Sequence, residues 1–348
     1  MPLDFEAAQD WQPPPEWQRL QTIDAHTAGE PFRILVGGTP EIPGASIPEK
    51  RRWAEQHADD LRRLLMLEPR GHADMYGCLL TEPVTPDADF GILFLHNEGF
   101  STMCGHGIIA AVTVALETGM LPAASEQATV TIDAPAGLIR ARAELRNGQV
   151  ERVTFRNVPS FVLDLDAAVE VPGYGTVRYD LAFGGAFYAF VDAGSIGLPC
   201  DAAHSDALIQ AGRAIKQAVQ QSREVPHPTE PDLGFLYGVI FTGPAAEAGR
   251  HSRHVCIFAD GELDRSPTGT GVSARIALCF ARREIDPGQT LTIESILGST
   301  FGCRAIEPTR FGPHEAVLVE VEGTATITGR HEFLLDPRDA FPKGFFLR

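Results

Sequence analysis

Two glycine-containing segments carry the side chains that could do chemistry. The first, residues 101–116 (STMCGHGIIAAVTVAL), places Cys104 directly before Gly-His-Gly and an apolar run. The second, residues 265–280 (RSPTGTGVSARIALCF), has almost the same shape, with Thr268 in the place of the cysteine. In both segments apolar residues recur every four positions after the glycines, which predicts a helix packed along one face. We therefore expect Cys104 and Thr268 at, or just before, the start of a helix.

The start of a helix suits both a reactive thiol and an anionic ligand. The glycines that follow Cys104 and Thr268 leave backbone N–H groups open to a ligand, and the helix dipole favours negative charge there. The same dipole is expected to lower the pKa of Cys104. A thiolate beside a carboxylate site fits the removal of a proton from the carbon next to that carboxylate.

Both segments also match the pattern G-x-G-x-x-A of dinucleotide-binding loops, at residues 105–110 and 269–274. That pattern requires a strand that runs directly into the glycines, and an acidic residue about 20 positions further on. In each half about eight residues separate the expected strand from the glycines, so the spacing disfavours a nucleotide cofactor.

The histidines could serve two other chemistries, a cysteine hydrolase or a metal site. A hydrolase with a Cys104–His106 pair is conceivable, but adjacent side chains on a tight turn rarely face each other. Metal binding through His26, Glu30, His72 or His106 has no recognisable ligand spacing. We expect no metal and no cofactor, with His26 and Glu30 at the edge of a strand.

The likeness between the two halves extends well beyond the glycines. Strand-like segments occur in the same order in each half, and each half has a charged helical pattern, over 48–67 and 202–222. Helix and strand patterns alternate, so the fold class is α/β or α+β. The strand-like segments that correspond are 29–36 with 184–191, 91–96 with 255–260, 130–137 with 291–298, and 150–158 with 315–323.

A repeat of this length predicts a duplicated domain rather than a solenoid. We expect an N-terminal lobe over 18–180 carrying Cys104 and a C-terminal lobe over 181–334 carrying Thr268. The tail, 335–348, is expected to pack back on the N-terminal lobe. Two related lobes favour a ligand site in the cleft between them.

The composition limits the partners. The chain has 348 residues and a formal net charge of −17, which disfavours nucleic acid and anionic membranes as partners. No apolar run approaches the ~18 residues of a membrane span. The first ten residues are acidic and lack the pattern of a signal peptide, so a cytoplasmic location is expected.

The six cysteines show no CxxC pair, and apart from Cys104 we expect buried, inert thiols.

Four segments in this order, IDAHTAGEPFRI, RGHADMYG, MCGHG and DRSPTGTG, resemble the proline racemase family. This family includes hydroxyproline epimerases and trans-3-hydroxy-L-proline dehydratases, and the resemblance extends over residues 20–348. It implies the fold of diaminopimelate epimerase, with two pseudo-symmetric lobes, each of β-structure curled around a central helix. It also implies a homodimer that needs no cofactor and acts on a small imino acid.

The second segment distinguishes the activities within this family. Racemases and epimerases of the family carry a cysteine in both segments, one on each face of the substrate carbon, whereas the dehydratases carry a threonine in the second. Thr268 follows the dehydratase pattern. The resemblance therefore implies dehydration of trans-3-hydroxy-L-proline to Δ1-pyrroline-2-carboxylate, with Cys104 as the base.

A physical argument supports the same choice. A threonine hydroxyl exchanges protons with a carbanion far less readily than a thiol does, so the carbanion returns its proton or expels a 3-hydroxyl group. Thr268 either hydrogen-bonds the departing hydroxide or orients a water. The alternatives are a 4-hydroxyproline epimerase, a proline racemase, and a catalytically silent imino-acid-binding protein.

The resemblance also implies which residues bind the substrate. Backbone amides surround the carboxylate, two side chains hold the ring nitrogen, and two aromatic rings enclose the substrate ring. The amides that bind the carboxylate belong to Gly105, His106, Gly269 and Thr270. The side chains that hold the ring nitrogen are those of His106 and Asp264, and the aromatic rings are those of Tyr76 and Phe258. Asp264 fits a helix N-cap as well, Tyr76 and Phe258 fit ordinary core positions, and Arg265 and Ser266 are expected to be structural.

Overall fold

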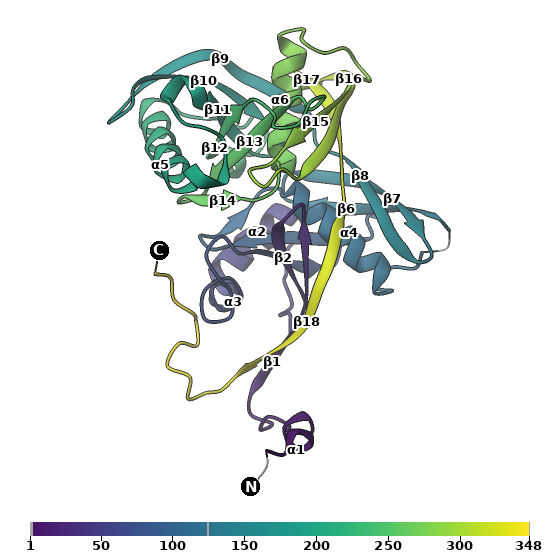
Figure 1. Cartoon of the computed structure of the whole chain (residues 1–348). Helices are drawn as coiled ribbons and strands as arrows, with labels where there is room; N and C mark the ends of the chain where they lie inside the picture. The colour runs from purple at the N-terminus through teal and green to yellow at the C-terminus, as the bar shows by residue number, and fades with distance from the viewer. Residues whose placement is uncertain (1–2, 124, 348) are drawn as a thin grey trace.

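The computed structural model describes residues 3–123 and 125–347, and over this part of the chain each half forms the same series of elements (Figure 1). A short helix, α1 (Phe5–Gln9), precedes them. The first half contains β1 (Gln18–Thr27), β2 (Glu30–Gly37), α2 (Ile47–His57), α3 (Asp59–Met66), β3 (Tyr76–Thr81), β4 (Phe90–His96), β5 (Phe100–Ser101), α4 (Gly105–Glu117), β6 (Gln127–Ala134), β7 (Gly137–Arg146), β8 (Gln149–Arg156) and β9 (Ser160–Val171). The second half contains β10 (Gly175–Phe183), β11 (Phe187–Asp192), α5 (Ser205–Ser222), β12 (Leu236–Gly243), β13 (Ser252–Phe258), β14 (Glu262–Asp264), α6 (Gly269–Ala281), β15 (Thr290–Glu294), β16 (Thr300–Phe311), β17 (His314–Gly323) and β18 (Ala325–Leu335).

Each lobe encloses one helix in a curved sheet. Helix α4 is buried from Gly105 to Leu116 and packs against β1, β2, β7, β8 and β18. Helix α6 occupies the same place in the other lobe, against β9, β10, β16 and β17. Both helices are apolar nearly all round, as helices inside a core must be. The α/β (α+β) class, with two similar lobes that each curl around a central helix, is confirmed.

The helical patterns outside these cores are less regular than expected. The pattern over 48–67 forms two helices, α2 and α3, which meet at Ala58. Helix α2 begins after Ser46, whose side chain accepts the Glu49 N–H at 3.3 Å in the usual manner of an N-cap. The pattern over 202–222 forms a 3₁₀ turn followed by α5, which packs on β12, β13 and β9.

The two halves exchange their last strands. Strand β9 belongs to the first half in sequence, but it pairs with β10 and β17 and packs on α6. Strand β18 ends the second half, yet it returns to pair with β1 over its whole length, as the yellow and purple strands of Figure 1 show. Each lobe therefore depends on a strand supplied by the other half.

The predicted boundary between residues 180 and 181 falls inside β10. We propose a division by strand pairing instead, with 18–158 and 325–335 in the N-terminal lobe and 160–323 in the C-terminal lobe. Asn157 marks the crossing, because its side-chain amide donates to the Gly184 carbonyl at 2.7 Å and to Ser273 Oγ at 2.8 Å.

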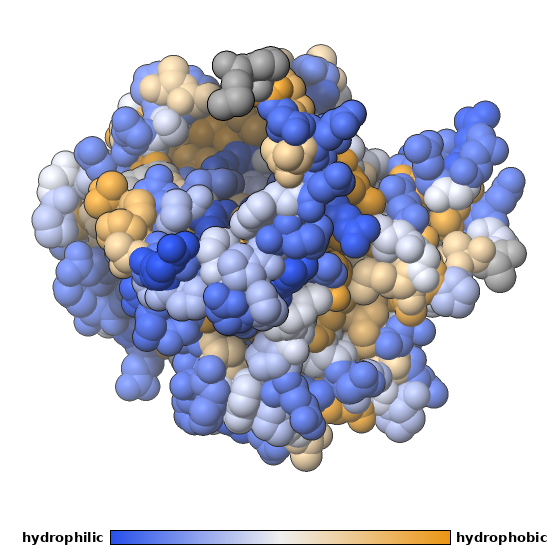
Figure 2. Space-filling view, turned by 90° about the horizontal axis from the view of Figure 1, so that it is seen from below, coloured by the Kyte–Doolittle hydropathy of each residue, from blue (hydrophilic) through white to orange (hydrophobic). Residues whose placement is uncertain are grey.

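The tail after β18 contacts the segment at the end of α3. The Phe345 N–H donates to the Glu68 carbonyl at 2.8 Å, and Lys343 pairs with Asp60 at 2.7 Å. The face seen from below in the orientation of Figure 1 is mainly hydrophilic, and its apolar residues lie in separate patches (Figure 2). Within residues 3–123 and 125–347, no helix has the length and apolar character needed to cross a membrane.

The starts of α4 and α6 meet head to head between the lobes. A Cβ atom added to Gly105 would lie 2.5 Å from the Gly269 Cα, and one added to Gly269 would lie 2.5 Å from the Gly105 Cα. Real Cβ atoms do not approach backbone so closely, and both neighbours are backbone atoms that cannot rotate away. Only glycine at both positions permits this contact.

We therefore expect Gly269→Ala to force the two helix starts apart. Overpacking of this kind costs about 1–3 kcal/mol of folding free energy, and thermal unfolding should show the loss. The matched control is Gly99→Ala, because a Cβ at Gly99 meets nothing within 4 Å. Equal unfolding temperatures for the two variants would contradict the close contact.

Candidate active site

Cys104 is the N-cap residue of α4. Its backbone is extended, with φ −146° and ψ 105°, and its Sγ accepts the Gly107 N–H at 3.2 Å. A cysteine thus fills the role that serine, threonine or aspartate usually takes at a helix start. The side chain is buried and lines a cavity between the lobes. The predicted position of Cys104 at the start of a helix is confirmed.

His106 folds back over the thiol, contrary to the expectation that these near neighbours would not face each other. Its Nδ1 lies 3.3 Å and its Nε2 3.5 Å from Cys104 Sγ. The rings of Tyr76 and Phe32 hold the imidazole edge-on, at centroid distances of 4.9 and 5.6 Å. Burial, assisted by the charge of Arg265, lowers the pKa of His106 to about 3. The imidazole is therefore neutral, and the pair is not the thiolate–imidazolium couple of a cysteine hydrolase.

The expectation of a lowered pKa for Cys104 is wrong for the unliganded cavity. Burial raises the pKa of Cys104 well above its ordinary value, and it outweighs the Gly107 N–H, which acts in the opposite direction. The carboxyl groups of Asp264 and Glu30 raise it further. The dipole of a helix start is worth at most ~2 kcal/mol, which is less than the cost of a charge without solvent.

Thr268 occupies the equivalent place before α6 but is held differently. Its backbone has φ +68°, a value that is unusual for a β-branched residue. Its hydroxyl does not cap the helix and instead donates to Asp264 Oδ2 at 2.8 Å. Asp264 Oδ1 accepts the Ser266 N–H at 2.7 Å, and Ser266 Oγ accepts the Thr268 N–H at 3.1 Å. Asp264 therefore organises the turn before the helix rather than capping its first residues.

The predicted site residues lie together around one small cavity between the lobes, with an accessible volume of ≈ 10 Å³. This is far less than the roughly 300–1,000 Å³ of typical small-molecule sites, so the side chains of the two lobes abut closely here. The lining residues that the sequence predicted are Tyr76, Cys104, Gly105, His106, Phe258, Asp264, Thr268, Gly269 and Thr270. The lining residues that it missed are Met103, Tyr188, Tyr237 and Cys256.

The missed tyrosines complete the wall of the cavity. The hydroxyl of Tyr237 lies 3.0 Å from that of Tyr76, and its ring stacks on Phe258 with centroids 5.5 Å apart. The Tyr188 hydroxyl lies 2.7 Å from Thr270 Oγ1. The internal repeat carried a signal for Tyr237, because the Tyr-Gly pair that opens β3 recurs at the start of β12.

Glu30 and Arg265 form a partly buried contact between the lobes. Glu30 is fully buried, and burial raises its pKa well above the ordinary value. Its Oε2 accepts the Arg265 N–H at 2.7 Å, and Arg265 also donates to the Asp74 carbonyl at 2.7 Å. Arg265 thus joins the two lobes. Across residues 3–123 and 125–347, no three His, Cys, Asp or Glu side chains are grouped to hold a metal ion.

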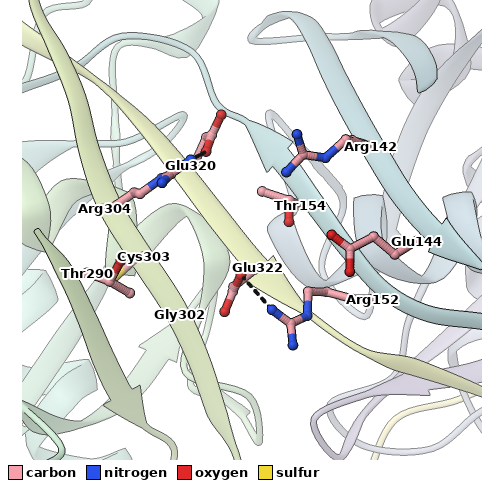
Figure 3. A pocket seen from close by; sticks show the side chains of 10 residues that line it. All are labelled: Arg142, Glu144, Arg152, Thr154, Thr290, Gly302, Cys303, Arg304, Glu320 and Glu322. Carbon is pink, nitrogen blue, oxygen red and sulfur yellow. Dashed lines mark hydrogen bonds and ion pairs between the residues drawn. The ribbon is translucent and has the colours of Figure 1, made fainter. Parts of the chain in front are cut away.

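A second cavity lies on the seam where β8 pairs with β17, and it has a different character (Figure 3). Charged side chains from both lobes line it, and they pair with each other. Arg152 lies 3.4 Å from Glu322, and Arg304 donates from Nε to Glu320 at 3.0 Å. The positive and negative side chains neutralise each other. The ion pair between Arg152 and Glu322 links a strand of one lobe to a strand of the other.

The arrangement of two curved sheets around buried helices is that of a known class of proteins. A PhzF-family protein of Bacillus anthracis superposes with a TM-score of 0.56 over 91% of this chain and 99% of its own, at 13% identity. Within this class the chain belongs to the proline racemase family, whose model matches residues 22–346. The family expected from the sequence motifs is confirmed.

Individual relatives cover nearly the whole chain. A protein of Colwellia psychrerythraea named trans-3-hydroxy-L-proline dehydratase is 48% identical over 98% of this chain and 97% of its own. A protein of Burkholderia multivorans named 3-hydroxyproline 2-epimerase is 44% identical over 94% and 98%. The crystal structure of a hydroxyproline epimerase from Agrobacterium vitis, with bound trans-4-hydroxy-L-proline, has a TM-score of 0.90 at 33% identity, covering 95% of this chain and 96% of its own.

The pKa of Cys104 leads to a direct test on the free protein. Because the raised pKa leaves the thiol protonated at neutral pH, a higher pH favours the thiolate. The rate of alkylation at Cys104 by iodoacetamide should rise about tenfold per unit between roughly pH 6 and 8.5, without a plateau. Peptide mapping by mass spectrometry locates the label, with glutathione as the reference thiol. A plateau below about pH 7.5 would mean an acidic thiol.

Proposed function

We propose that this protein dehydrates trans-3-hydroxy-L-proline to Δ1-pyrroline-2-carboxylate without a cofactor. The observation that carries the proposal is a single cavity with Cys104 at one helix start and Thr268 at the other. The cavity is small and closed, and relatives that cover nearly the whole chain bear the dehydratase name. Membership of the proline racemase family supports a small imino acid as the substrate.

The two facing helix starts form the site for the substrate carboxylate. The residues after Cys104 and Thr268 present backbone N–H groups, and both helix dipoles point their positive ends to the same place. Among residues 3–123 and 125–347, no lysine or arginine lines the cavity. In this proposal the amides of Gly105, His106, Gly269 and Thr270 bind the carboxylate, so a negatively charged group is held without a basic side chain.

The other cavity residues take the roles expected from the family. The His106 side chain and Asp264 hold the ring nitrogen, and the rings of Tyr76 and Phe258 enclose the substrate. Cys104 then removes the proton from C2. Its high pKa in the empty cavity makes it a strong base once ionised, because the buried thiolate has no water to stabilise it.

Elimination follows because the position that matches Cys104 at the second helix start holds Thr268 instead of a thiol. As the electrons of the C2–H bond form the C2=C3 double bond, the C3–O bond breaks and the hydroxyl leaves as water. The resulting enamine tautomerises to Δ1-pyrroline-2-carboxylate. Thr268 cannot return a proton to C2 as a second cysteine would, since its hydroxyl proton is donated to Asp264.

A second candidate function is epimerisation of 3-hydroxyproline at C2. Cys256 lines the cavity on the Thr268 side, where its strand β13 pairs with β14 at Asp264. A thiol is therefore present on that side, although burial raises its pKa well above the ordinary value. The name of the Burkholderia multivorans relative points to the same activity.

A homodimer, which the family resemblance implies, and a cytoplasmic location, which is expected from the sequence, also belong to this proposal. Light scattering coupled to gel filtration measures the first, and fractionation of the source cells measures the second. A monomer of about the chain mass, 37.6 kDa, would remove the dimer from the proposal.

We expect Cys104→Ser to fold and to lose essentially all dehydratase activity, because a serine hydroxyl does not ionise at neutral pH. The loss should be at least about 10³-fold, measured by formation of the pyrroline in a buffer with chelator and no added cofactor. The matched control is Cys78→Ser, which changes a buried thiol in β3 away from the cavity. Comparable turnover in both variants would remove Cys104 from the role of base.

Thr268 decides between elimination and inversion. In D2O the wild type should convert trans-3-hydroxy-L-proline to the pyrroline and form no C2-deuterated epimer of trans-4-hydroxy-L-proline. Thr268→Cys places a second thiol opposite Cys104 and should admit epimerisation while dehydration falls. NMR spectroscopy follows both products. Epimerisation by the wild type at a rate rivalling dehydration would favour the second candidate, and Cys256→Ala would then abolish it.

A further inference from the structure

The departing hydroxyl must receive a proton inside a closed cavity. The side chains of Cys104, Thr268, His106 and Asp264 are all at most 5% exposed, so bulk water does not reach this point. Hydroxide is a very poor leaving group without a proton donor. The proton must therefore come from a group of the cavity wall, and the sequence does not say which.

We infer that Cys104 acts twice in one turnover, first as the base at C2 and then as the acid that gives the same proton to the departing 3-hydroxyl. This inference rests on the proposed dehydration of trans-3-hydroxy-L-proline. It makes the reaction a syn elimination that takes place entirely on the Cys104 side of the substrate ring.

The stereochemistry of the substrate determines from which face of the ring the hydroxyl departs. In the trans isomer the carboxylate at C2 and the hydroxyl at C3 lie on opposite faces of the ring. The hydrogen at C2 and the hydroxyl at C3 therefore share one face. Because Cys104 removes that hydrogen, the departing hydroxyl also lies on the Cys104 side, next to the sulfur that has just been protonated.

The neighbours of Cys104 leave no other acid on that side. The hydroxyl of Tyr76 donates to Ser101 and is shared with Tyr237, and burial raises the pKa of Tyr76 well above its ordinary value. His106 is neutral, because burial lowers its pKa to about 3, so no imidazolium is available at neutral pH. Within residues 3–123 and 125–347, the newly protonated Cys104 thiol is therefore the acid best placed for the departing hydroxyl when the C3–O bond breaks.

On the Thr268 side of the cavity, the hydroxyl groups form hydrogen bonds with other protein side chains. Thr268 donates to Asp264 Oδ2 at 2.8 Å, and Thr270 shares a hydrogen bond with Tyr188 at 2.7 Å. Any donor there, including the Cys256 thiol, faces the side of the ring from which the hydroxyl is absent. Thr268 thus contributes by standing where a second helix-start thiol would be, rather than by protonating the hydroxyl.

The step balances without an external reactant. The C2–H bond breaks and its proton forms the S–H bond of Cys104, while its electron pair forms C2=C3. The C3–O bond breaks, the S–H proton moves to the leaving oxygen, and water departs. Cys104 is a thiolate again at the end, ready for the next substrate.

The diagnostic substrate is cis-3-hydroxy-L-proline, compared with the trans isomer on the wild-type enzyme in D2O. Its C2 hydrogen faces Cys104 in the same way, but its hydroxyl lies on the opposite side. We expect dehydration to be at least about 100-fold slower than for the trans isomer. Proton NMR spectroscopy follows pyrroline formation.

The two 3-chloro-L-prolines form the control, because chloride leaves without a proton. Both chloro isomers should eliminate at rates within about tenfold of each other, since only the hydroxyl needs the acid. Dehydration of the cis alcohol at a rate near that of the trans alcohol would overturn the inference. So would equal isomer discrimination for chloride and hydroxyl. No dehydration of the trans alcohol would instead reject the proposed function itself.

Discussion

The contact between Gly105 and Gly269 is the constraint on which the rest of the structure depends. Two helices can meet head to head only if their first residues have no side chains, because each Cα occupies the place where the other's Cβ would lie. The contact directs two sets of unpaired N–H groups to one point. Three features hold the starts of α4 and α6 together. They are the curved β-structure around each helix, the exchanged strands β9 and β18, and Arg265 between the lobes.

The same closeness determines the electrostatics of the site. A cavity formed by two abutting lobes excludes water, and desolvation raises the pKa values of the thiol of Cys104 and the carboxyl groups of Asp264 and Glu30. The helix dipoles act in the opposite direction but are too weak to compensate.

Local sequence patterns were sufficient for features that depend on one segment. The glycine spacing located Cys104 and Thr268 at helix starts, and the repeat predicted two lobes that each enclose a helix. Features that arise from packing between distant segments could not be predicted from the sequence. The fold of the His106 ring over Cys104 depends on Tyr76 and Phe32, the raised pKa of Cys104 depends on burial, and the exchange of β9 and β18 depends on long-range pairing.

Duplication explains why the site is built from two equal halves, but the chemistry depends on where they differ. The repeat places Phe100 of β5 opposite Asp264 of β14, so only the second half has a carboxyl group before its helix. That carboxyl accepts the hydroxyl proton of Thr268, whereas the thiol of Cys104 lies beside the neutral imidazole of His106 and faces the cavity. The first half thus keeps a mobile proton and the second half immobilises one. A symmetric framework can therefore hold a substrate from both sides and still move its proton on one side alone.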